Sequence, residues 1–294
     1  MKAEGKIIKS LSGFYYVLSD DGVYQCRARG VFRKRSITPL VGDIVKFEAD
    51  NKTDGTVIDI LPRKNELIRP PIANVDQVFI VGSVKEPDLS LQLLDKFLVH
   101  VEANKIDAMI GFTKMDLLNA AERENLNKIA EIYRSIGYPV FFLSTLEPAS
   151  FHALRSHLKD KITVVAGQSG VGKSSLLNEL EPALQIETRE LSHHLGRGKH
   201  TTRHVELLSV AGGYIADTPG FSSLDLSQFY DHDLSNYFPE MKRVSGNCKF
   251  RGCTHLSEPQ CAVKEALNDG TIAQIRYDHY EQFYHEVKQI KRRY

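Results

Sequence analysis

The pattern of apolar and polar positions changes twice along the chain, and the changes divide it into three parts. Residues 1–61 hold five short runs of β-forming character at 6–9, 14–18, 23–27, 44–48 and 56–60. Turn signals such as Asp21-Gly22 and Asp54-Gly55 separate these runs. Five short strands in about sixty residues predict a small barrel, with an OB-fold as the leading candidate. The proline-rich segment 62–71 that follows is typical of a linker.

Between residues 76 and 217 the spacing of apolar positions changes, and the apolar runs become continuous. They lie at 78–81, 108–112, 140–143 and 162–166, and amphipathic segments at 91–103, 121–136 and 150–158 separate them. Buried parallel strands read as continuous apolar runs and are connected by helices. This part therefore predicts a doubly wound α/β sheet.

Beyond residue 226 the pattern is helical. Tyr280, Phe283, Tyr284 and Val287 follow i, i+3, i+4, i+7 spacing, so the last helix has one apolar face. We expect this face to pack against the protein rather than to stack on RNA. The three patterns together predict domains at residues 1–65, 66–225 and 226–294.

Composition and charge exclude some classes of protein. No apolar run approaches the roughly 20 residues that cross a bilayer, and the polar amino terminus is unlike a signal peptide, so we expect a cytoplasmic protein. The net charge of +1 hides a local basic cluster in the barrel. Such a cluster is compatible with nucleic-acid contact and also with solvated surface charge. Its members are Arg27, Arg29, Arg33, Lys34 and Arg35.

Residues 167–174 read Gly-Gln-Ser-Gly-Val-Gly-Lys-Ser, which is a phosphate-binding loop. The glycines would let backbone N–H groups approach phosphates closely, at the positive end of the following helix. Lys173 would reach the β- and γ-phosphates, and Ser174 would bind Mg²⁺ through its hydroxyl. The candidate nucleotide-binding residues of this loop are Gly167, Gln168, Ser169, Gly170, Val171, Gly172, Lys173, Ser174 and Ser175.

A second phosphate-site motif, Asp217-Thr218-Pro219-Gly220, follows the β-forming run at 213–216. Asp217 would hold Mg²⁺, usually through water, and the Gly220 N–H would sense the γ-phosphate. The motif is weak alone, and its position after a phosphate-binding loop makes it strong.

The tetrad Thr113-Lys114-Met115-Asp116 follows the apolar run at 108–112. The Asp116 carboxylate can accept hydrogen bonds from the N1–H and N2–H₂ edge of guanine, which adenine does not offer. Lys114 would pack along the base and ribose. Thr113 stands where such tetrads usually carry Asn, which leaves a base or loop-bracing contact open. Ser144, with Thr145 beside it, could brace the base from the other side.

The order of these motifs is informative, because the base-reading tetrad comes before the phosphate-binding loop. Ordinary GTPases run the other way, so the order predicts a circularly permuted P-loop GTPase. A P-loop kinase or ATPase with a metal-binding appendage is the competing hypothesis, and Asp116 speaks against it.

The segment 196–203, Gly-Arg-Gly-Lys-His-Thr-Thr-Arg, occupies the place of a first switch. Thr202 is the first choice for contacting Mg²⁺ and the γ-phosphate, and Thr201 is the alternative. Phe221 stands where a water-orienting Gln is found in Ras-like proteins, so we expect slow intrinsic hydrolysis. His200 could position or deprotonate water, or it could only contact RNA or solvent. The catalytic candidates are His200, Lys173 and Thr202.

Three of the four cysteines lie close together, as Cys248-x4-Cys253-x-His255-x5-Cys261. Three thiolates and one imidazole are the ligand count of a closed structural zinc site. A catalytic metal is disfavoured because no ligand position remains open. Cys26 stands apart on a predicted strand, and we expect it to be a core residue.

A small barrel, a permuted GTPase and a Cys/His zinc domain together resemble the RsgA family of bacterial GTPases that depend on the small ribosomal subunit. The resemblance implies a late assembly factor that hydrolyses GTP to GDP and phosphate with Mg²⁺, holds one structural Zn²⁺, and is stimulated by the subunit. The barrel and the zinc domain would bind ribosomal RNA. The expected protein is a monomer with no DNA or membrane partner. A GTP-dependent binding module, in which hydrolysis is incidental, is the alternative that shares every motif.

Overall fold

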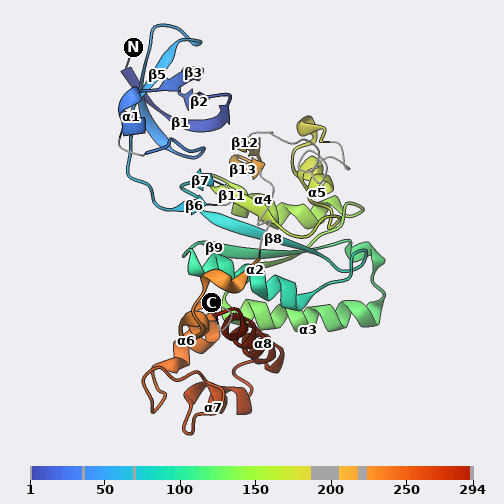
Figure 1. The fold of residues 1–294 in the computed structure, drawn as a ribbon. Coiled ribbons are helices and arrows are strands. Elements are labelled where there is room, and N and C mark those ends of the chain that lie inside the picture. The colour runs from blue at the N-terminus through green and yellow to red at the C-terminus, as the bar shows by residue number, and fades with distance from the viewer. Residues whose placement is uncertain (1, 35–36, 69–70, 187–204, 218–223, 292–294) are drawn as a thin grey trace.

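The computed structural model describes residues 2–34, 37–68, 71–186, 205–217 and 224–291. It contains a barrel, a central sheet covered by helices, and a helical carboxy-terminal part, in chain order (Figure 1).

The first part is a closed five-stranded barrel. Its elements are β1 (Lys2–Leu11), β2 (Phe14–Ser19), β3 (Gly22–Ala28), α1 (Gly30–Lys34), β4 (Ile44–Ala49) and β5 (Gly55–Ile60). The strand order is β1-β2-β3-β5-β4, and β4 pairs again with β1 to close the barrel. Alternate side chains such as Val45 and Phe47 are fully buried inside it. The predicted barrel with OB-fold connectivity is confirmed, and Cys26 lies in its core as expected.

The segment 62–71 is more ordered than the linker that its prolines predict. It contains β6 (Glu66–Ile68), which pairs with β7 (Pro71–Ala73). Leu67 and Ile72 from this hairpin are buried. Arg63 donates from Nε and Nη2 to the fully buried carboxylate of Asp43 at 2.7 and 2.8 Å. Apolar burial and a bidentate ion pair therefore hold this segment against the barrel, so the residues predicted as a linker are structured.

The central sheet carries the predicted parallel strands. These are β8 (Gln77–Ser83), β9 (Asp107–Thr113), β10 (Val140–Phe142), β11 (Ile162–Ala166) and β13 (Gly213–Asp217), with β12 (Val205–Val210) antiparallel to β13. The order is β10-β9-β8-β11-β13-β12. All four strands expected from continuous apolar runs are present.

Helices cover both faces of this sheet. They are α2 (Leu91–Ala103), α3 (Ala120–Ile136), α4 (His152–Leu158) and α5 (Lys173–Leu180), with 3-10 turns η1 (Met115–Leu117), η2 (Pro148–Phe151) and η3 (Pro182–Leu184). Val78 and Ile80 of β8 share a core with α2 and α3, whereas Phe79 and Val81 share one with α4 and α5. A strand whose successive side chains are all buried must be covered on both faces. In the part of the chain that the structure describes, no helix has the length and apolarity needed to cross a bilayer.

The barrel and the central sheet form one continuous sheet through a pairing that the sequence analysis did not predict. Strand β1 pairs antiparallel with β12, with Lys9 opposite Glu206 and Ser10 opposite Val205. The Lys9 ammonium lies 2.8 Å from the Glu206 carboxylate. The barrel is therefore attached along β12, at the opposite end of the central sheet from β10.

The carboxy-terminal part is helical, as expected. It contains η4 (Leu226–Gln228), η5 (Asp231–Tyr237), α6 (Pro239–Ser245), α7 (Ala262–Asn268) and α8 (Gln274–Lys291). The apolar stripe of α8 is buried against Leu234, Phe238 and Met241, so its packing role is confirmed. Val99 of α2 belongs to the same core. The helical part therefore packs directly on α2 of the central domain (Figure 1).

A buried charge cluster crosses this interface. Asp95 of α2 and Arg276 of α8 are both fully buried, with Oδ1 and Nη1 2.5 Å apart. Arg276 also lies 2.7 Å from Glu240 of α6, and His279 Nδ1 lies 2.5 Å from the second oxygen of Asp95. Tyr133 of α3 donates to Asp95 at 2.9 Å. Groups from four helices thus surround two buried carboxylates and one buried guanidinium, and Nη1 of Arg276 contacts Asp95 as an ion pair without a hydrogen bond of good geometry.

Replacing Arg276 tests this cluster. Arg276→Met keeps a long apolar stem but leaves Asp95 and Glu240 buried without their cation. Removing one partner of a buried pair costs about 3–5 kcal/mol, so we expect urea unfolding followed by circular dichroism to show a loss of that size. Lys2→Met, which breaks the exposed Lys2–Glu48 pair, is the control and should cost less than about 1 kcal/mol. A loss below about 1 kcal/mol for Arg276→Met would contradict the role of the cluster.

Candidate functional site

The candidate nucleotide-binding residues lie on loops at one edge of the central sheet. Strands β8, β9, β10 and β11 are parallel, so their carboxyl ends meet at the same edge. The loops that leave them begin at Val84, Lys114, Leu143 and Gly167. Ligands of open α/β sheets bind outside these carboxyl ends, which is where the structure brings the tetrad and the phosphate-binding loop together.

The phosphate-binding loop requires glycine at its first position. Gly167 has φ of +146°, and a Cβ there would lie 2.2 Å from the carbonyl oxygen of Val81. Only glycine adopts such a conformation without strain and permits that close approach. Gly172 has φ of +92° and lies directly before the first residue of α5. Of the residues between them, Gln168, Ser169 and Gly170 are exposed and Val171 is buried, so the first part of the loop faces solvent.

Lys173 and Ser174 begin helix α5. The Lys173 ammonium donates to the carbonyl oxygens of Gly167 and Gln168 at 2.8 and 2.6 Å, so the side chain folds over its own loop. Burial lowers the pKa of Lys173 from its ordinary value. The Ser174 side chain is buried in the first turn, and Ser175 is half-buried beside it. A cation and a hydroxyl at a helix amino terminus suit polyphosphate and a divalent ion.

Thr113 joins the tetrad to the phosphate-binding loop. Its hydroxyl donates to the carbonyl oxygen of Val171 at 2.6 Å, and both residues are buried. A loop-bracing contact is therefore present although Thr113 stands in place of Asn. This hydrogen bond fixes the distance between the two motifs.

Asp116 is exposed on the turn η1, where its carboxylate can meet a base. The buried hydroxyl of Ser144 donates to Asp116 Oδ1 at 2.6 Å and accepts from the N–H of Leu146 at 3.1 Å. The structure thus brings Asp116 and Ser144 together, while a contact of Ser144 with the base stays a prediction. Thr145 is exposed beside them.

The loop between β8 and α2 contributes residues that the sequence analysis missed. The Lys85 ammonium donates to the carbonyl oxygen of Leu117 at 3.1 Å and lies 2.8 Å from the carboxylate of Glu122. The backbone carbonyl of Glu86 accepts from the Lys114 ammonium. No motif marks Lys85 or Glu86, because their role depends on contacts with residues far along the chain.

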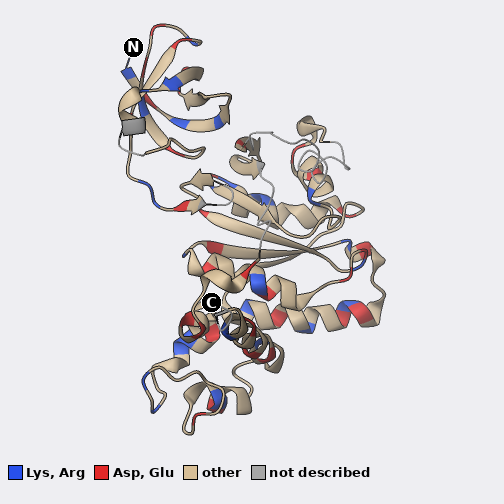
Figure 2. Cartoon of the chain, in the orientation of Figure 1, with Lys and Arg blue, Asp and Glu red and all other residues tan. Residues whose placement is uncertain are grey.

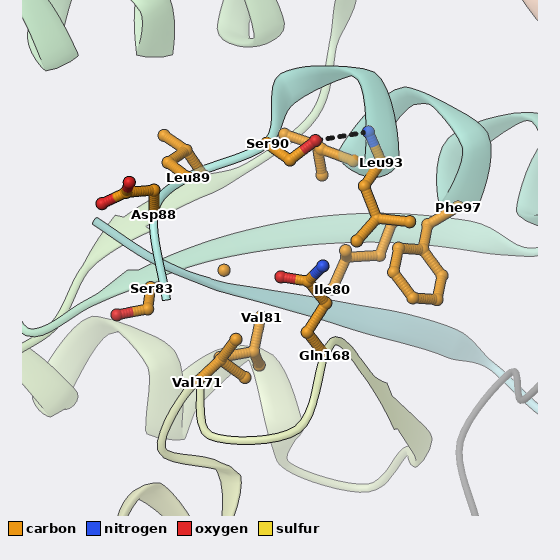
Figure 3. A pocket seen from close by; sticks show the side chains of 12 residues that line it. Ile80, Val81, Ser83, Asp88, Leu89, Ser90, Leu93, Phe97, Gln168 and Val171 are labelled. Carbon is orange, nitrogen blue, oxygen red and sulfur yellow. Dashed lines mark hydrogen bonds between the residues drawn. The ribbon is translucent and has the colours of Figure 1, made fainter. Parts of the chain in front are cut away.

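The same loop borders a pocket beside the phosphate-binding loop. Figure 3 shows Asp88, Ser90 and Phe97 on one side of it and Gln168 and Val171 on the other. Ser90 caps α2, with its hydroxyl accepting from the N–H of Leu93 at 3.2 Å. The start of α2 is therefore part of the wall next to the candidate nucleotide site.

Several predicted site residues lie outside the part of the chain that the structure describes. They are His200, Thr201, Thr202, Gly220 and Phe221. For Asp217 the structure gives only the backbone, at the end of β13 next to β11. That strand end lies at the same sheet edge as the phosphate-binding loop, because β11 and β13 are parallel.

The predicted metal ligands come together in the carboxy-terminal part. One ligand atom each of Cys248, Cys253, His255 and Cys261 lies within 4.8 Å of the others. Cys248 Sγ lies 3.9 Å from Cys261 Sγ and 3.6 Å from His255 Nδ1. Ligands at the usual Zn–S and Zn–N distances in a tetrahedron are about 3.6–3.8 Å apart. The cluster therefore could hold one metal ion of the size and preference of zinc.

Residues around this cluster fix its geometry. The Glu258 carboxylate accepts from the N–H and the hydroxyl of Thr254 at 2.8 and 2.6 Å. Tyr277 donates to the carbonyl oxygen of His255 at 2.7 Å, and Tyr280 donates to that of Thr254 at 2.6 Å. Such outer hydrogen bonds orient metal ligands. Two tyrosines of α8, Tyr277 and Tyr280, thus also support the candidate metal centre.

The basic cluster of the barrel is described only in part. Arg27 lies over the ring of Phe14, with its guanidinium carbon 4.8 Å from the ring centre, and Arg29 is exposed. The side chains of Arg33, Lys34 and Arg35 lie outside the described residues. RNA contact by this cluster stays a prediction.

Lys85→Met tests the role of the β8–α2 loop. Loss of the contacts to Leu117 and Glu122 loosens the segment that carries Asp116, so guanine-nucleotide affinity should fall. Because the Lys85–Glu122 pair is partly exposed, we expect the variant to lose about 1 kcal/mol of binding free energy, or roughly fivefold in affinity. A titration with fluorescent GDP measures this loss. Lys128→Met breaks an exposed ion pair with Glu124 on the same helix as Glu122 and serves as the control. Equal affinity for the wild type and both variants would show that Lys85 does not position the tetrad.

Comparison with known proteins places the chain in a family. A model described as RsgA GTPase matches residues 60–227, and one described as RsgA N-terminal domain matches residues 4–57. Curated proteins from Halalkalibacterium halodurans and Bacillus subtilis are 58% and 55% identical, each over 99% of both chains. Both are named small ribosomal subunit biogenesis GTPase RsgA.

Solved structures agree with this result. One described as YloQ, a circularly permuted GTPase, has a TM-score of 0.85 at 49% identity and covers 98% of this chain and 96% of that chain. YjeQ from Thermotoga maritima has a TM-score of 0.87 at 36% identity, covering 98% of this chain and 99% of that chain. The permuted GTPase fold predicted from motif order is thereby confirmed, and the chain belongs to the RsgA GTPase family.

Proposed function

We propose that this chain hydrolyses GTP to GDP and phosphate as a late assembly factor of the small ribosomal subunit, and that the subunit stimulates hydrolysis. The Thr113–Val171 hydrogen bond carries the nucleotide part of the proposal, because it joins a guanine-type tetrad to a phosphate-binding loop. The names of relatives 58% and 55% identical to this chain support the ribosomal part.

The base and phosphates contact different loops of the site. Asp116, held by Ser144, accepts the two guanine N–H groups, and Lys114 lies along the base. Backbone N–H groups of residues 167–175 surround the phosphates, and Lys173 exchanges its contacts with Gly167 and Gln168 for the β- and γ-phosphates. The Gly220 N–H contacts the γ-phosphate.

Ser174, Asp217 and Thr202 are the residues that would hold Mg²⁺ with GTP. That ion, when bound, neutralises charge on the phosphate oxygens. With Phe221 in place of a water-orienting Gln, His200 positions the attacking water. Contact with the subunit brings His200 to the γ-phosphate, so we expect hydrolysis to be slow without the subunit.

The flanking parts bind the partner. The barrel's basic cluster and the carboxy-terminal part contact ribosomal RNA, the former mainly through phosphate charge. Zn²⁺ at Cys248, Cys253, His255 and Cys261 stabilises the carboxy-terminal part. The protein acts as a monomer in the cytoplasm, with no DNA or membrane partner.

GTP turnover with and without small subunits tests the function. We expect stimulation by subunits for the wild type and loss of most of it for His200→Ala, with GDP affinity unchanged, because His200 acts only in the transition state. ATP should neither turn over nor compete within tenfold of GTP. A wild type that binds subunits in a GTP-dependent way without stimulated turnover would instead support a binding module. Normal stimulated turnover by His200→Ala would remove His200 from the mechanism.

Metal analysis tests the zinc centre. Protein purified without chelators should hold one Zn²⁺ per chain, and Cys253→Ser should lose it. Structural zinc supplies folding energy, so that variant should unfold the carboxy-terminal helices while still binding GDP. Cys26→Ala, in the barrel core, is the control and should keep its zinc. Wild-type protein without zinc would refute the assignment.

A further inference from the structure

The loop between Cys248 and Cys253 exposes an aromatic ring. Phe250 is 45% exposed, and its neighbours Lys249, Arg251 and Gly252 are exposed as well. Among the described residues, Phe250 and Tyr230 are the exposed large aromatic side chains. An exposed ring between two cations differs from a scattered surface residue and needs a reason.

The position of the loop explains why the ring cannot reach the core. Both of its ends are candidate metal ligands, so only four residues connect two fixed points. The N–H of Lys249 donates to the carbonyl oxygen of Gln260 at 3.2 Å, which ties the loop to the residue before Cys261. The ring is thus held outward on a short braced loop, and little conformational entropy is lost when a partner contacts it.

The charge around the ring is positive. Between residues 242 and 264 the sequence holds five basic side chains and one acidic side chain, Glu258. The Glu258 carboxylate is occupied by hydrogen bonds from Thr254 and Leu256. Figure 2 colours parts of α6 and of the loop below it blue, the colour of Lys and Arg. The Lys249 ammonium lies 5.7 Å from the centre of the Phe250 ring.

We propose that Phe250 stacks on an unpaired base of an RNA, while Lys249 and Arg251 contact the phosphates on either side. A ring between two cations matches the alternation of base and phosphate along a single strand. One ring offers too little apolar area for a stable protein interface, which usually buries well over 1,000 Å². In a duplex the bases are stacked on each other, so the partner is a loop, bulge or single strand. The proposal rests on the proposed ribosomal function, and it adds the contact chemistry of this loop.

Subunit binding provides the first test. Phe250→Ala should weaken binding of the full chain to small subunits by roughly 5- to 100-fold, whereas Phe250→Tyr should keep it. Tyr230→Ala, at another exposed aromatic of the same part, is the control and should bind like the wild type. Zinc content and GDP affinity of every variant should equal those of the wild type. Unchanged binding by Phe250→Ala would overturn the proposal.

A spectroscopic test identifies the class of partner, because the chain contains no tryptophan. Phe250→Trp places a single indole at the proposed contact, and stacking on a base should quench its fluorescence. We expect quenching by a short unpaired RNA oligonucleotide and not by a paired RNA duplex, and none for Tyr230→Trp. If Phe250→Ala weakens subunit binding but Phe250→Trp is not quenched by unpaired RNA, the loop contacts protein and the proposal fails. If the wild type does not bind subunits at all, the proposed ribosomal function is wrong. The fluorescence result alone then decides whether Phe250 stacks on an unpaired base.

Discussion

A carboxylate that water does not reach fixes the relation between the carboxy-terminal helices and the nucleotide edge. Asp95 accepts from Tyr133 and faces Arg276 and His279, and each of these groups stands on a different helix or a different turn. Because a buried charge without its partners is very unfavourable, α8 can take only the register on α2 that places Arg276 and His279 at Asp95. Ser90, which caps the start of α2, lines a pocket together with Gln168 and Val171 of the phosphate-binding loop. The helical part and the nucleotide edge are therefore connected by one rigid element.

Much of the fold and the site could be predicted from the sequence, because their signals are local. The strands of the barrel and of the central sheet follow from hydrophobic period, and the glycine loop follows from backbone conformations that only glycine adopts. The four candidate metal ligands lie within 14 residues, so their spacing alone predicted that they come together. The order of tetrad and loop predicted the permutation without any tertiary information.

The features that the sequence did not predict are contacts between distant residues. Strand β12 was missed although it connects barrel and sheet, since its pairing with β1 depends on register across some two hundred residues. Lys85 carries no motif, and only its distance to Glu122 and Leu117 shows what it holds. Segment 62–71 looked like a linker because prolines and charges dominate it, while the burial of Leu67 and Ile72 is decided by the barrel. The Thr113 hydroxyl could be recognised as a brace only once Val171 was seen opposite it.

The permutation places the end of β13 directly before the helical part, and the few residues between them limit the distance that can separate the two. Asp217 ends the strand, and Leu226 is already fully buried among the carboxy-terminal helices. Even fully extended, residues 218–223 can span at most about 25 Å between the described residues on either side. In an unpermuted GTPase the glycine that corresponds to Gly220 is followed by further strands and helices of the same domain. Here the carboxy-terminal part follows the strand after only a few residues, so the length of residues 218–223 limits how far the end of β13 and that part can lie from each other.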